Sequence, residues 1–146
     1  MKVTPLFITQ KKNLFNMCLF YTLEDHPGYR AKVAEEDITC YKIVREYDKE
    51  EGKYTSPRYK RKKWEIGKTY TNKGEKGDFA CAVYGGFYHT YESKAIAECL
   101  CKEYPGKTHV AKCAIPKGTI YYVGFVNNTE IRGYASRKLK IEEICV

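Results

Sequence analysis

Short apolar runs separated by turn residues fill much of the chain after residue 37 and predict β-strands. The first run, residues 38–45, is rich in β-branched and aromatic residues, which favour an extended backbone. Runs of the same kind, most of them bounded by turn residues, occupy residues 64–66, 79–84, 87–91, 108–115, 119–126, 130–135 and 139–145. Because 64–66 is only a short candidate and 87–91 continues the run 79–84, we expect a mainly antiparallel sheet of about six strands.

One segment has the spacing of a helix instead. Ser93 is a favoured N-cap residue, and Pro105-Gly106 provides a stop signal. Between them the apolar positions recur at intervals of three and four residues, at Ile96, Cys99, Leu100 and Tyr104. This spacing predicts one principal helix over about 93–104, and the sheet and helix together predict an α+β fold.

Segment 119–126 is apolar or aromatic on both of its faces. The faces consist of Ile120, Tyr122 and Val126 on one side and of Tyr121, Val123 and Phe125 on the other. A strand that is covered on both sides by other parts of the protein has this composition. We expect this strand to be central in the sheet.

Residues 1–16 differ from the rest of the chain, because they show no clear periodicity and include Pro5. We expect them to form a flexible extension to a single α+β domain of residues 17–146. The apolar run from Leu14 to Tyr21 is divided by Asn16 and is far shorter than the ~20 residues of a membrane span. It therefore predicts neither a signal peptide nor a membrane anchor.

The chain has seven cysteines, an odd number, which is typical of free thiols in a reducing compartment. Cys99, Cys101, His109 and Cys113 are ligand types of zinc sites. In the predicted helix, however, positions i and i+2 point about 200° apart, so Cys99 and Cys101 cannot close on one ion. The sequence predicts neither a metal nor another cofactor.

The net charge of +8 is concentrated in the middle of the chain, where residues 53–76 hold nine basic and two acidic residues. Its densest part, residues 58–64, interleaves aromatic residues with cations. The predicted anion-binding residues are Arg58, Lys60, Arg61, Lys62 and Lys63, together with Arg137. Rings that stack on bases and cations that contact phosphates are typical of single-stranded nucleic-acid or nucleotide sites. A solvated loop between two strands is the alternative interpretation.

A second candidate site lies beside the glycine pair Gly85-Gly86, where the missing side chains allow close approach of a ligand. The predicted ligand-binding residues are Tyr88, His89, Thr90, Tyr121 and Tyr122. His89 either faces the ligand or is a rim histidine bonded to backbone. We predict no catalytic residue, because no serine, cysteine or lysine has a base partner visible in the sequence.

Several segments resemble a family of small proteins, without an assigned activity, that are encoded by gut anaerobes and their phages. The matching segments are residues 34–43, Thr55-Ser56-Pro57, 85–90, 115–122 and 134–139. The resemblance runs from about Met17 to the end, which implies that Met17 is the usual start. It also implies a cytoplasmic protein of a mobile element.

A looser resemblance is to the ADP-ribosyltransferase superfamily, in which a Gly-Phe-Tyr-x-Thr strand precedes an alanine-containing helix. Residues 86–90, with Ala95 and Ala97, are similar to that fragment. The resemblance implies that an arginine or histidine on an early strand and a glutamate on a late one hold NAD. Arg45 and Glu130 are the conceivable counterparts here.

Three functions therefore stay open. The first is a non-enzymatic binding protein that sequesters a host protein or an anionic nucleotide in counter-defence. The second is a nucleic-acid-binding module that uses residues 58–64, and the third is a degenerate or active NAD-using transferase. The sequence favours the first and gives no oligomeric state.

Overall fold

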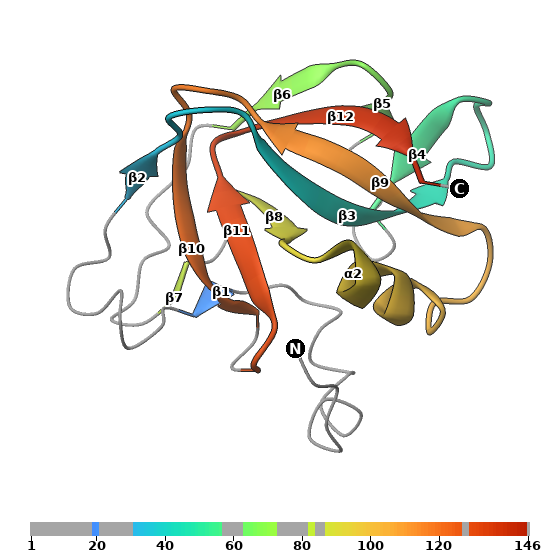
Figure 1. Cartoon of the computed structure of the whole chain (residues 1–146). Coiled ribbons are helices and arrows are strands. Elements are labelled where there is room, and N and C mark those ends of the chain that lie inside the picture. Colours follow the sequence, from blue (N-terminus) through green and yellow to red (C-terminus); the bar gives the residue numbers. More distant parts are fainter. Residues whose placement is uncertain are drawn as a thin grey trace.

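Antiparallel strands dominate the part of the chain that the structure describes (Figure 1). This computed structural model describes residues 31–56, 63–72, 87–126 and 129–145, and the backbone of 19–20 and 82–83. The strands are Leu19–Phe20 (β1), Lys32–Val33 (β2), Ile38–Glu46 (β3), Lys53–Thr55 (β4), Lys63–Glu65 (β5), Thr69–Thr71 (β6), Ala82–Val83 (β7), Tyr88–Tyr91 (β8), Thr108–Ile115 (β9), Ile120–Val126 (β10), Arg132–Ser136 (β11) and Lys138–Ile144 (β12). Within the described ranges the one helix is α2, Lys94–Cys101.

The predicted α+β class with about six strands is wrong, because twelve strands among the described residues form one sheet and the described helix has eight residues. The fold is close to all-β. Strands such as β2, β4 and β6 have two or three residues. That length is too short to show the alternation by which a strand is found in a sequence. The predicted extension 1–16 lies outside the described residues.

The sheet consists of two halves that meet at a narrow seam. Its order is β6-β12-β9-β3-β8-β11-β10-β1-β7, with β2 beside β10 and the β4–β5 pair beside the end of β3. Strands β3 and β9 pair continuously from Ile38 to Arg45, whereas β3 and β8 pair only at Tyr41 and Tyr91. We call this single pair the seam. In Figure 1, β3, β9 and β12 run at a steep angle to β10 and β11.

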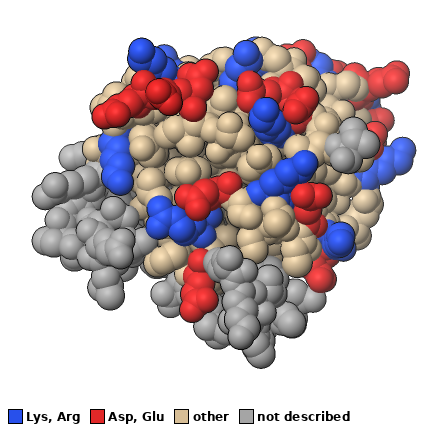
Figure 2. Space-filling model, in the orientation of Figure 1, with Lys and Arg blue, Asp and Glu red and all other residues tan. Residues whose placement is uncertain are grey.

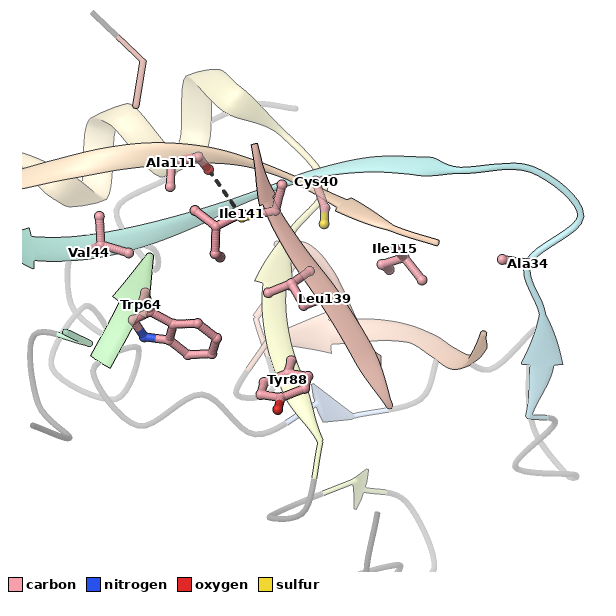
Figure 3. Close-up of a cluster of buried hydrophobic side chains, with 10 residues drawn as sticks. Ala34, Cys40, Val44, Trp64, Tyr88, Ala111, Ile115, Leu139 and Ile141 are labelled. Atoms are coloured by element: carbon pink, nitrogen blue, oxygen red, sulfur yellow. Dashed lines mark hydrogen bonds between the residues drawn. The ribbon is translucent and has the colours of Figure 1, made fainter. Parts of the chain in front are cut away.

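One face of the sheet, which we call the inner face, carries the larger of the hydrophobic clusters. Alternation along β3 places Cys40 and Val44 on this face, and the aromatic residues Trp64 and Tyr88 join them from β5 and β8. The remaining buried members are Ala34, Ala111, Cys113, Ile115, Leu139 and Ile141. Figure 3 shows the Trp64 and Tyr88 rings close to each other, with Leu139 and Ile141 nearby. These side chains fill the middle of the inner face.

The opposite, outer face is covered by α2. Ile96, Ala97 and Leu100 of the helix pack into a cluster with residues of four strands and the β10–β11 turn, namely Ile43, Tyr91, Val110, Val126 and Ile131. The predicted N-cap is confirmed, since the Ile96 amide donates to the Ser93 hydroxyl at 3.3 Å. The helix ends at Cys101 rather than at 104, and Cys99, predicted on the apolar face, is exposed.

Segment 119–126 forms an interior strand, as predicted, but it is not covered throughout on both faces, because four of the seven residues of β10 are only half-buried. Strand β10 pairs with β11 along one edge and with β1 and β2 along the other. Its Val123 and Val126 are buried, and they lie on opposite faces of the sheet.

Candidate ligand-binding site

Three of the five predicted ligand-binding residues share the inner face. Ser136 of β11 pairs with Tyr88 on one side and with Tyr121 on the other, so these side chains form one row across three strands. Thr90 pairs with Tyr134 in the next row of the same face. Tyr88 and Thr90 are buried, and Tyr121 and Tyr134 are half-buried.

The other two predicted residues, His89 and Tyr122, lie on the outer face. Both are paired with Ala135, and the Tyr122 ring meets Phe87 edge to face at 5.4 Å. Neighbouring residues on a strand point to opposite faces of the sheet. Residues 88–90 therefore cannot all face one ligand, and neither can Tyr121 and Tyr122 together. The structure therefore brings together Tyr88, Thr90 and Tyr121 and separates them from His89 and Tyr122.

Edge-to-face aromatic contacts build the floor of the inner face. The Trp64 ring lies 4.9 Å from Tyr70 and 5.5 Å from Tyr88, measured between ring centroids. Tyr121 and Tyr134, which are more exposed, lie 6.0 Å apart. Such pairs hold rings in fixed orientations, so the half-buried rings stand on a rigid base.

Lys42 is the unexpected member of this face, because it lies between Cys40 and Val44 on an otherwise apolar side of β3. Its ammonium group lies 5.3 Å from the centroid of the Trp64 ring and donates to the His89 carbonyl at 3.3 Å. The side chain therefore reaches across the seam from β3 to β8. A cation held over an aromatic ring in a half-buried position is stabilised by the ring quadrupole.

The hydroxyl and thiol groups on the inner face are uncharged at physiological pH. The Thr90 hydroxyl is buried without an oxygen or nitrogen partner in the described ranges. Burial raises the pKa of the nearby Cys40 thiol to about 12. A hydrogen bond with Thr90 and the charge of Lys42 lower this pKa by smaller amounts. The pKa of Cys113 is also raised well above its ordinary value by burial. Neither thiol is an activated nucleophile.

A carboxylate closes one end of this arrangement. The Tyr134 hydroxyl donates to Glu92 Oε2 at 3.3 Å, and Arg132 Nε contacts the same oxygen at 3.2 Å. Burial and then the charge of Glu92 raise the pKa of Tyr134 to about 12, so its hydroxyl remains a donor.

We call Lys42, Tyr121 and Tyr134 the inner-face site, with the buried residues Trp64, Tyr88 and Thr90 as its floor. The sequence analysis missed Lys42 and Tyr134. A signal for Lys42 was available, since a charged residue at an apolar position of an alternating strand is unusual. Tyr134 becomes recognisable only through its pairing with Thr90.

The predicted anion-binding residues do not form one described patch. Lys63 lies 3.2 Å from Glu50 and 4.6 Å from the centroid of the Tyr47 ring, and the Glu50 hydrogen bond raises the pKa of Lys63. Arg137 is exposed between β11 and β12, at a different part of the sheet. Arg58, Lys60, Arg61 and Lys62 lie outside the described residues. Figure 2 shows basic and acidic side chains interspersed on the visible face.

Arg45 and Glu130, the conceivable counterparts of the transferase residues, do not belong to the inner-face site. The Arg45 guanidinium donates to the Pro105 carbonyl at 2.8 Å on the outer face, and Glu130 is exposed in the turn before β11. The four candidate zinc ligands are also dispersed, with Cys113 on the inner face and His109 Nε2 2.7 Å from Glu46 Oε2. Across the described ranges, no group of three His, Cys, Asp or Glu side chains could hold a metal ion.

Comparisons of this chain with protein-family models, with curated proteins and with solved structures find no match. Within the described part of the chain, no helix has the length and apolar character needed to cross a membrane.

Proposed function

We propose that this chain is a small non-enzymatic binding protein that sequesters an anionic nucleotide in the inner-face site. The observation that carries the proposal is Lys42, a half-buried cation on an aromatic face. Lysine is rarely placed on the apolar side of a strand, because burial of its charge costs free energy. An anion bound beside this ammonium group would add to the contacts that it makes with the Trp64 ring and the His89 carbonyl.

The groups around Lys42 suit the parts of a nucleotide. Its ammonium group would contact the phosphate, and the half-buried rings of Tyr121 and Tyr134 would contact the flat base. The Thr90 side chain lies in the same row as Tyr134, but it is fully buried and supports the site from within.

The chemistry of the site favours binding over catalysis. The thiols of Cys40 and Cys113 stay protonated, and Tyr134 stays neutral, so none of them serves as a nucleophile or base near pH 7. The resemblance to proteins of phages supports a cytoplasmic protein that withdraws a host nucleotide in counter-defence. Binding of nucleic acid through residues 58–64 is less well supported, since Lys63 already contacts Glu50.

Fluorescence of the single tryptophan tests this proposal, because Trp64 forms the floor of the site and contacts Lys42. Titration with adenine and guanine nucleotides should change its emission. Lys42→Gln should weaken binding by at least about tenfold, since it removes the charge that contacts the phosphate.

Lys68→Gln is the matched control, because the Lys68 ammonium also lies over a ring, that of Tyr70 at 5.5 Å, but is exposed. It should leave the affinity unchanged. Binding that is equal in the Lys42 variant and the wild type, or no binding of any nucleotide, would refute the proposal.

A further inference from the structure

The hydrogen-bonding groups around the two rings of the inner-face site bear on which bases it accepts. The backbone at these rings has no group to spare, because Tyr121 and Tyr134 are each paired with residues on both neighbouring strands. Residues in such a position use their amide and carbonyl groups within the sheet. Recognition of a particular base edge would therefore depend on side chains.

The buried polar side chains beneath the rings have partners inside the protein. The Ser136 hydroxyl donates to the Lys138 carbonyl at 2.9 Å, and the Thr90 hydroxyl bonds with the Cys40 thiol. Ser136 and Thr90 are both 0% exposed, so a ligand does not reach them. A site discriminates strongly when a wrong ligand leaves a buried polar group without a partner. Neither hydroxyl can impose that penalty on a ligand here.

The polar groups beside the rings that a ligand does reach are partly open to water. The Tyr134 hydroxyl donates to Glu92, whose carboxylate also contacts Arg132, and these two charged side chains are 42% and 44% exposed. The Tyr121 hydroxyl belongs to a half-buried residue and can either donate or accept, so it suits different base edges. A base that does not bond with these groups leaves them to water, which costs little.

We infer that the inner-face site accepts nucleotides with any of the four bases, and that it holds the base by its ring face rather than by its hydrogen-bonding edge. This inference rests on the proposed function and specifies its ligand class. Every base has an aromatic face, so contact with Tyr121 and Tyr134 does not depend on the donors and acceptors of the base. Purines should bind slightly more tightly than pyrimidines, because their larger rings bury more area.

Isothermal titration calorimetry with AMP, GMP, CMP and UMP tests this inference, since these four ligands share a ribose and a 5′-phosphate and differ only in the base. Their affinities for the wild type should lie within about tenfold of one another. Tyr121→Phe removes a hydroxyl and keeps the ring, so it should change all four affinities by the same factor. A wider spread in the wild type, or a change in Tyr121→Phe that is confined to some bases, would overturn the inference.

The contribution of the ring itself is measured with Tyr134→Leu, which should weaken binding of all four nucleotides by at least about tenfold. Tyr104→Leu is the matched control, because Tyr104 is a half-buried tyrosine that packs against the outer cluster, and it should leave the four affinities unchanged. Tyr134→Leu binding that is as tight as the wild type, or weakened for some bases only, would also overturn the inference.

The wild-type comparison depends on no variant, and circular dichroism confirms that each variant is folded before its affinities are interpreted. A strong preference for one base would overturn this inference and leave the proposed function intact. Absence of binding by every nucleotide would instead overturn the proposed function, and this inference with it.

Discussion

Replacing Trp64 with alanine tests whether the inner face is a packed aromatic core. The side chain is 3% exposed and meets Tyr70 and Tyr88 edge to face, and its indole nitrogen donates to the Ser56 hydroxyl at 3.4 Å. Loss of a buried tryptophan costs about 3–5 kcal/mol through lost burial and the remaining cavity. A domain of ordinary stability has about 5–15 kcal/mol, so Trp64→Ala should remove a large fraction.

Urea unfolding followed by far-ultraviolet circular dichroism measures this loss, because the variant has no tryptophan to report fluorescence. Trp64→Phe keeps a ring in contact with Tyr70 and Tyr88 and should cost about 1–2 kcal/mol. Ile66→Ala is the matched control, since Ile66 lies just after β5 but is 42% exposed, and it should cost less than about 1 kcal/mol. Equal losses for Trp64→Ala and Ile66→Ala would show that Trp64 is not part of the core.

Three further predictions concern the helix, the thiols and acid stability. Ser93→Ala should lower the free energy of unfolding by about 1 kcal/mol in urea titrations, because the Ile96 amide loses its acceptor; no loss would contradict the capping role. Exposed Cys99 should react rapidly with Ellman's reagent in the native protein, whereas Cys40 should react only after unfolding, since burial raises its pKa to about 12. The hydrogen bond from His109 lowers the pKa of Glu46, so this pair stabilises the fold above the ordinary carboxyl pKa, and its contribution is lost as the pH falls. Glu46→Gln should therefore lose less stability than the wild type between about pH 5 and about pH 3 in thermal melts, and identical acid profiles would argue against the pairing.

Long elements of this fold were predictable because their own residues specify them. Strands β3 and β9 coincide closely with the apolar runs 38–45 and 108–115, and the start of α2 follows from Ser93. The short strands were not predictable, because two or three residues carry no period of their own and extend only where a neighbouring strand binds them. Because these short strands were missed, the predicted class was α+β, whereas the observed fold is close to all-β.

The candidate site was predictable only in part, for a related reason. The sequence drew attention to Tyr88, Thr90 and Tyr121, which do share a face, but it also grouped them with His89 and Tyr122. A sequence shows which residues are neighbours along the chain, whereas a sheet face is made of every second residue and of partners on other strands.

The seam between β3 and β8 gives the molecule a place to bend. Ladders of many hydrogen bonds make each half of the sheet stiff, whereas one residue pair at Tyr41 and Tyr91 resists a change of angle only weakly. The helix α2 contacts β3, β8 and β9, so it connects the two halves on the outer side of this hinge. A ligand that contacts Lys42 of one half and Tyr134 of the other would join the two halves on the inner side. Binding would then change the angle between the halves and slow amide hydrogen exchange along the hinge.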